Sequence, residues 1–219
     1  MTLERFIHHA AAELPDPAET VAEARERLRD RFPRTSLRRM THLGLLVGAA
    51  MERAAPDSAD AVVYASTFAE TRALEDYLNS FPAASPLLFQ TSIHPSGVQQ
   101  ALIARQQPVA RLWPMAARER LVEQALLTAL MEPAARVIVT GGEERGTWML
   151  ERGMASDRTF AFALELTRDA ADAAGRVTFM ADGRAEAAGP SLASLTECIA
   201  ARRPLAWAGA GGAWTLEWR

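Results

Sequence analysis

The polar residues best placed to do chemistry lie in one short loop, residues 91–97, with the sequence TSIHPSG. His94 stands between Ser92 and Ser96, just ahead of a predicted helix whose N-terminus could orient an anion. A histidine near hydroxyls could activate a nucleophile, but a working triad requires neighbours in space, and the Gly-x-Ser-x-Gly elbow is missing. We therefore expect His94 to anchor this loop. A catalytic site built from His94, Ser92 and Ser96 remains the alternative.

The other histidines do not suggest a metal site. His8 and His9 are adjacent in a predicted strand, so their side chains should point to opposite faces and could not converge on one ion. His42 lies on a periodic helix beside Arg38 and Arg39, where a solvated or hydrogen-bonded histidine is the usual case. We expect neither a metal nor a cofactor.

Three further features limit the possible chemistry. Gly141 and Gly142 follow a predicted strand but do not match Gly-x-Gly-x-x-Gly, so a tight turn is expected there. Cys198, the single cysteine, lies on a predicted helix without a histidine or lysine to activate it, which favours a buried structural thiol. All 24 basic residues are arginine, which excludes Schiff-base, pyridoxal phosphate and phosphate-loop chemistry.

The composition is that of one soluble globular domain spanning residues 1–219. Of these residues, 49% are hydrophobic and 23% are charged. The net charge of -3 disfavours binding to nucleic acid, and no apolar run approaches the roughly 20 residues that span a bilayer. With one cysteine and no recognisable signal segment, a cytoplasmic location is expected.

Strand and helix patterns alternate along most of the chain. A start signal at Asp16, Pro17 and Glu19 opens the first predicted helix. The predicted helices are residues 16–31, 36–54, 69–79, 95–106, 118–131 and 191–202. The predicted strands are 5–12, 60–66, 109–113 and 136–140, then 159–167 and 176–181 as half-exposed antiparallel strands, and a hairpin of 205–208 with 213–218. The fold class is therefore layered α/β with a mixed, mainly parallel sheet and added C-terminal antiparallel strands.

The order of several segments resembles the N-terminal half of β-ketoacyl synthases of the thiolase-like fold. These segments are the stretch Arg38-Arg39-Met40 with the helix that continues to Ala55, the strand DAVVYAS, the Ser85-Pro86 pair, the His94 loop and its helix, and RVIVTGGEE. The resemblance covers residues 5–167 and leaves 168–219 as a strand-helix-strand extension. It implies a half-thiolase-like architecture.

The resemblance also locates the family's nucleophilic cysteine. Eight residues after Pro108 and 25 before Gly141 both lead to Ala116, whose methyl group cannot attack a thioester. The half of the family that carries its two catalytic histidines has no counterpart here. Where short relatives often have Ser-Val-His-Asn, this chain has Ser92-Ile93-His94-Pro95, so a polar side chain is lost.

The chain looks most like standalone, chain-length-factor-like proteins of type II fatty acid, aryl polyene and polyketide pathways. That likeness implies a catalytically silent subunit whose partners are a ketosynthase, an acyl carrier protein, or both. It also implies a homo- or heterodimer through the strand Val109, Ala110, Arg111, Leu112 and Trp113. Two alternatives stay open: an acyl-thioester hydrolase or transferase that uses the His94 loop, and an unrelated binding or scaffold module.

Overall fold

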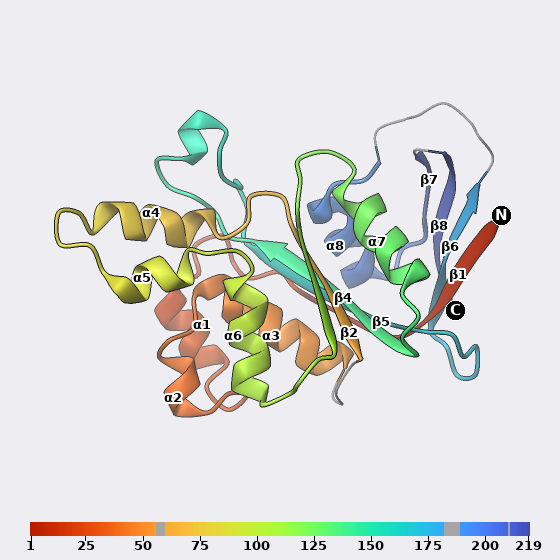
Figure 1. The fold of residues 1–219 in the computed structure, drawn as a ribbon, viewed down its shortest axis with the longest axis horizontal. Helices are drawn as coiled ribbons and strands as arrows, with labels where there is room; N and C mark the ends of the chain where they lie inside the picture. Colours follow the sequence, from red (N-terminus) through yellow and green to blue (C-terminus); the bar gives the residue numbers. More distant parts are fainter. Residues whose placement is uncertain (56–59, 182–188, 210) are drawn as a thin grey trace.

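A computed structural model describes residues 1–55, 60–181, 189–209 and 211–219 (Figure 1). Its strands are β1 (Thr2–Glu13), β2 (Ala61–Ser66), β3 (Arg111–Ala116), β4 (Arg136–Glu143), β5 (Phe160–Thr167), β6 (Gly175–Ala181), β7 (Leu205–Gly209) and β8 (Gly212–Trp218). Its helices are α1 (Val21–Arg27), α2 (Arg34–Leu37), α3 (His42–Ala54), α4 (Thr71–Asn79), α5 (Pro86–Thr91), α6 (Ser96–Arg105), α7 (Leu121–Met131) and α8 (Leu192–Ala201), with a 3-10 turn at Leu150–Arg152.

One eight-stranded sheet carries the fold, in the order β3-β2-β4-β5-β1-β6-β8-β7. The α/β class, the mixed sheet and the antiparallel C-terminal strands are as predicted. The expectation of a mainly parallel sheet is wrong, because only β3-β2 and β2-β4 are parallel and the other five described pairs are antiparallel. Helices separate β2, β3 and β4 along the chain, which allows these strands to run parallel. The antiparallel pairs arise where a loop joins β4 to β5, where a hairpin joins β7 to β8, and where β1 lies between β5 and β6 and runs opposite to both.

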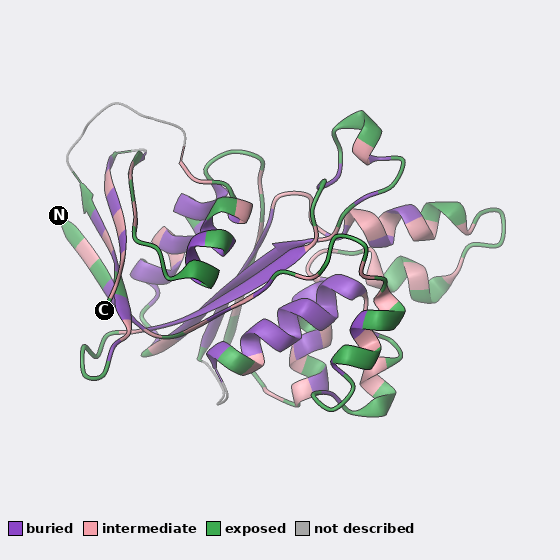
Figure 2. Cartoon of the chain, turned by 180° about the vertical axis from the view of Figure 1, so that it is seen from behind, coloured by how far each residue is buried: buried purple, intermediate pink, exposed green. Residues whose placement is uncertain are grey.

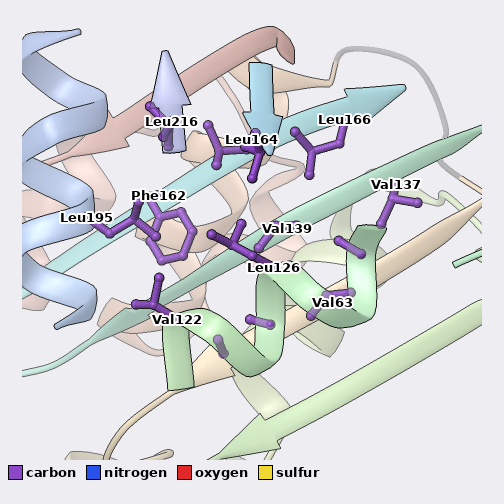
Figure 3. Packing of buried hydrophobic residues seen from close by; sticks show 14 of the residues in the cluster. Val63, Val122, Leu126, Val137, Val139, Phe162, Leu164, Leu166, Leu195 and Leu216 are labelled. Atoms are coloured by element: carbon purple, nitrogen blue, oxygen red, sulfur yellow. The ribbon is translucent and has the colours of Figure 1, made fainter. Parts of the chain in front are cut away.

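Two hydrophobic cores cover the two faces of the sheet. On one face α7 and α8 pack on residues such as Val139, Phe162 and Leu164, which are fully buried (Figure 3). On the other face α3 lies against the sheet, buried along most of its length, and α6 packs beside it (Figure 2). Strand β5, predicted to be half exposed, is buried along nearly its whole length because it lies between β4 and β1.

Helix starts differ from the prediction in two places. Thr20 caps α1 and forms a capping box with Glu23, whereas the Asp16 carboxylate accepts only the Ala18 N–H in the preceding turn. Residues 36–54 are not one helix: α2 ends at Leu37, and α3 begins at His42 behind a Thr41 cap that accepts from the Gly44 N–H.

Gly141 and Gly142 do not form the expected turn. Both lie within β4, which continues to Glu143. A Cβ on Gly141 would stand 2.0 Å from the Ala65 carbonyl oxygen of β2, so only glycine permits this close approach. In the described residues no helix is both long and apolar enough to cross a membrane.

Candidate functional site

The carboxyl ends of the parallel strands β2, β3 and β4 lie together at one end of the sheet, where α/β folds commonly bind ligands. A cavity of about 780 Å³ opens beside these strand ends. We call it the strand-end cavity. Its lining comes from the loop after β2, the β3–α7 connection, the end of β4, residues 156–160 and the start of α8. Loops and helix starts from distant parts of the chain meet here.

Glu143 is the most buried carboxylate of the strand-end cavity. It is 3% exposed, and it accepts hydrogen bonds from the Ser66 hydroxyl at 3.1 Å, from the Phe68 N–H at 3.3 Å and from the Thr67 N–H. Burial raises the pKa of Glu143 to about 7, although these hydrogen bonds favour the ionised form. Glu143 thus holds the start of the loop after β2 in place, because its carboxylate accepts hydrogen bonds from three consecutive residues there.

Two of the arginines that line this cavity, Arg118 and Arg158, contact other parts of the protein. Arg118 lies over the Phe68 ring at 5.6 Å and donates to the Gly153 carbonyl at 2.8 Å. Arg158 pairs with Glu197 at 2.8 Å. These contacts brace the loops around the cavity.

The strand-end cavity contains no sulfur nucleophile among its lining residues. Ala116, at the expected nucleophile position, is the exposed last residue of β3. Cys198 is buried in α8, as predicted, and does not line the cavity. None of the four histidines lines it either. The cavity can therefore bind a ligand but offers neither thiol nor imidazole for covalent thioester chemistry.

His94 anchors its loop to the body of the protein. Its Nδ1 lies 2.9 Å from Glu70 Oε2, and its ring stacks on Tyr64 with 5.2 Å between centroids. The other Glu70 oxygen accepts from the Tyr64 hydroxyl at 3.3 Å and from the Gly97 N–H at 3.0 Å. Glu70 is 4% exposed and is the centre of this network. Its role was not predicted, because it stands 24 residues before His94 in a segment without a motif.

The hydroxyls of Ser92 and Ser96 are hydrogen-bonded to backbone carbonyls and not to His94. The Ser92 hydroxyl donates to the Phe89 carbonyl at 2.8 Å, and the Ser96 hydroxyl donates to the Thr91 carbonyl at 2.5 Å. Both are local caps of the kind that serine often makes to its own backbone. Neither serine hydroxyl is hydrogen-bonded to a histidine in the described part of the chain.

A second cavity of about 960 Å³ lies on the other face of the sheet, between α1, α3 and α4. His42 and Glu144 line it. His42 Nε2 lies 3.2 Å from Glu19 Oε2, and burial lowers the pKa of His42. Glu144 accepts from the Leu43 N–H at 3.3 Å, and burial raises the pKa of Glu144 to about 7. No role was predicted for His42, and Glu144 carries no motif that points to it.

The remaining histidines lie apart from both cavities. His8 Nε2 is 3.0 Å from the Asp169 carbonyl, and His9 Nδ1 is 2.6 Å from Glu165 Oε2. Across the described ranges, no group of three or more histidine, cysteine, aspartate or glutamate side chains is placed to hold a metal ion.

Strand β3 forms one edge of the sheet. The expected strand at 109–113 is shifted, because Val109 and Ala110 precede β3, which runs on to Ala116. Proline at position 114 is compatible with an edge strand, where a missing N–H is tolerated. Trp113 is 43% exposed, and its Nε1 donates to Glu132 Oε2 at 2.8 Å.

The α4–α5 arm, residues 71–91, projects beyond the sheet (Figure 1). No charged residue occurs from 77 to 104, in a chain that is 23% charged. Tyr77 packs its ring 5.3 Å from both Phe81 and Phe89. Large exposed apolar side chains gather on and beside the arm: Leu78, Phe81, Leu87, Phe89 and Ile93. Charge depletion with exposed aromatics is typical of the core of a protein interface.

Comparison with known proteins identifies the fold. No family model matches the chain, and no curated protein does so significantly. A similar solved structure is that of a ketosynthase, ApeO, in complex with its chain length factor, ApeC, from Xenorhabdus doucetiae. The matched chain is 19% identical with a TM-score of 0.68, and the match covers 98% of this chain and 99% of that one. The ishigamide ketosynthase/chain length factor structure matches at 14% identity and a TM-score of 0.56, over 82% of this chain and 68% of that one. The chain has the ketosynthase-like fold, as predicted.

Proposed function

We propose that this chain is a non-condensing, chain-length-factor-like subunit. It works in the cytoplasm with a ketosynthase and an acyl carrier protein in the assembly of fatty acyl or polyketide chains, such as aryl polyenes. The fold and the nearly equal length of the matched chain in the ketosynthase/chain length factor complex support this proposal. We assign this chain the role of a partner subunit, because condensation requires a nucleophile and Ala116 stands where the family's nucleophile would be.

The observation that carries the proposal is Ala116. It is the exposed last residue of β3 and is not among the residues that line the strand-end cavity, and its methyl group cannot capture an acyl group. The chain's one thiol, Cys198, is buried on a different element. An acyl-enzyme intermediate therefore has to form on the partner.

The edge of β3 is the surface that we assign to the partner. An edge strand offers unpaired backbone groups to another strand, and a two-fold axis through such a pair continues the sheet across two subunits. The half-exposed Trp113 and the exposed aromatics of the α4–α5 arm add apolar area that a partner could cover. A ketosynthase of the same fold could supply the matching edge.

Reconstitution tests this proposal. The chain is produced together with a candidate ketosynthase and a candidate acyl carrier protein from the same genome, and acyl products on the carrier are followed with and without the chain. We expect elongation or product length to depend on this chain, and to be lost when the cysteine of the partner ketosynthase is replaced. Products that are unchanged without the chain, or that persist without the partner's cysteine, would overturn the proposal.

A further inference from the structure

We propose that the second cavity and a groove that adjoins it bind a soluble anionic amphiphile, a phosphate monoester with a short apolar chain. This inference concerns a different place from the β3 edge and does not depend on the proposed function. It rests on the arginines of the cavity, on the pairing of its acidic residues and on the groove beside it.

Arginines without acidic partners surround the second cavity. Arg38, Arg39 and Arg145 line it, and none of the three is within ion-pair distance of a carboxylate in the part of the chain that the structure describes. Arg25 donates to the Met40 carbonyl at 3.1 Å, and its Nε is buried without a hydrogen-bond partner. Guanidinium groups present paired N–H donors that match the oxygens of a phosphate. Their positive charge is therefore left for a ligand.

The acidic residues of this cavity do not cancel that charge. Glu19 is bound by Arg27 at 2.7 Å and lies against His42, and Asp76 is bound by Arg72 at 2.5 Å. The pKa of Glu144 is raised to about 7, so this carboxyl is partly neutral at neutral pH. Glu151 also lines the cavity and has no ion pair among the described residues, but three arginines without acidic partners, Arg38, Arg39 and Arg145, line it as well. A dianion consequently meets more unpaired positive than negative charge on the walls.

An apolar groove adjoins the arginines. A smaller cavity of about 290 Å³ shares Arg39, Met40, Leu87 and Thr91 with the larger one. Its exposed apolar side chains are Leu87 and Ile103, which is 74% exposed, whereas Met40 is buried and serine, threonine and glutamine side chains complete the lining. A head group bound at Arg39 would place an attached chain along Leu87 and Ile103. This juxtaposition favours an amphiphile over a simple ion, and the cluster of guanidinium groups favours a phosphate over a carboxylate.

Calorimetric titration with octyl phosphate, kept below the concentration at which it forms micelles, tests the inference. We expect one molecule to bind per chain. Binding should be at least about tenfold tighter than that of inorganic phosphate or octanoate, and octyl glucoside should not bind. Equal affinity for octyl phosphate and inorganic phosphate would contradict the role of the groove, and equal affinity for octanoate would contradict the phosphate head.

Matched variants locate the site. The double variant Arg38→Ala, Arg39→Ala changes two exposed residues, and its circular dichroism should match that of the wild type. It should weaken octyl phosphate binding about tenfold or more, whereas Arg176→Ala, on the distant strand β6, should not. Equal loss in both variants, or no loss in the double variant, would overturn the assignment. Sedimentation with vesicles that contain phosphatidic acid distinguishes a lipid headgroup, and binding to vesicles without binding to octyl phosphate would contradict a soluble ligand.

Discussion

Glu143 and Glu144 are consecutive in the chain, yet their side chains line two different cavities on opposite faces of the sheet. Burial raises the pKa of each to about 7. Their hydrogen bonds differ, because Glu143 gathers three donors from residues 66–68 whereas Glu144 accepts one N–H, from Leu43. The two residues should therefore respond differently to the same substitution.

Glu144→Gln should flatten the dependence of stability on pH. The folded pKa of Glu144 lies above its unfolded value, so the protonated form stabilises the fold below about pH 4.5, and this contribution is lost as the pH rises through 7. A glutamine keeps an oxygen for the Leu43 N–H and does not ionise. Urea unfolding at pH 5 and pH 8 should show a fall in stability that is smaller in the variant by about 1 to 3 kcal/mol. Parallel falls in both proteins would contradict this prediction.

Glu143→Gln should destabilise the protein at pH 7. Hydrogen-bond donors approach both carboxylate oxygens of Glu143. In a glutamine variant the amide nitrogen replaces one of these oxygens, so at least one donor would face a nitrogen that cannot accept its hydrogen bond. A buried donor without an acceptor costs about 1 to 3 kcal/mol. Thermal unfolding should give a lower Tm than that of the wild type or of Glu144→Gln, and hydrogen exchange at Thr67 and Phe68 should accelerate. The prediction fails if the two glutamine variants are equally stable.

Arg5→Met should be among the most destabilising single substitutions. Arg5 is fully buried on β1 and donates to the carbonyls of Glu132, Ala134 at 2.9 Å and Ala135 at 3.3 Å, which follow the end of α7. A methionine fills similar space but removes the donor of the Ala134 and Ala135 carbonyls, whereas the Glu132 carbonyl keeps a hydrogen bond from Arg168 at 3.2 Å. The expected cost is about 2 to 4 kcal/mol. Chemical denaturation measures this loss. Arg176→Ala, on the surface, is the matched control and should not change stability measurably.

Much of the fold could be predicted from local patterns. The apolar run of β2, the periodic face of α7 and the Ser191 start of α8 all lie where expected. Strand direction could not be predicted, because β1 is first in the chain yet lies between β5 and β6. The glycines at 141 and 142 were misjudged because their need for glycine comes from a neighbouring strand.

The candidate sites were harder to predict. The His94 loop was found because proline and serine surround one histidine, but its partner Glu70 carries no motif. The second cavity joins residues from 17 to 159 along the chain, and its positive charge depends on which arginines have acidic partners. Pairing of this kind is a property of the folded chain and has no pattern in the sequence.

Cysteine footprinting should detect the partner at the β3 edge. In a Cys198→Ala background, Ala116→Cys places a thiol on the exposed last residue of β3, and Ala170→Cys places one on an exposed residue outside β3. Both should react rapidly with a maleimide in the isolated chain. A bound ketosynthase should slow labelling at 116 and leave 170 unchanged. Equal labelling at 116 with and without the partner would exclude this edge from the interface.

Native mass spectrometry of the chain mixed with its ketosynthase and acyl-loaded carrier protein tests the central claim most directly. The account predicts a complex that holds one copy of this chain and one ketosynthase, with the acyl mass on the ketosynthase alone. An acyl group covalently attached to this chain, or the absence of any complex, would contradict it.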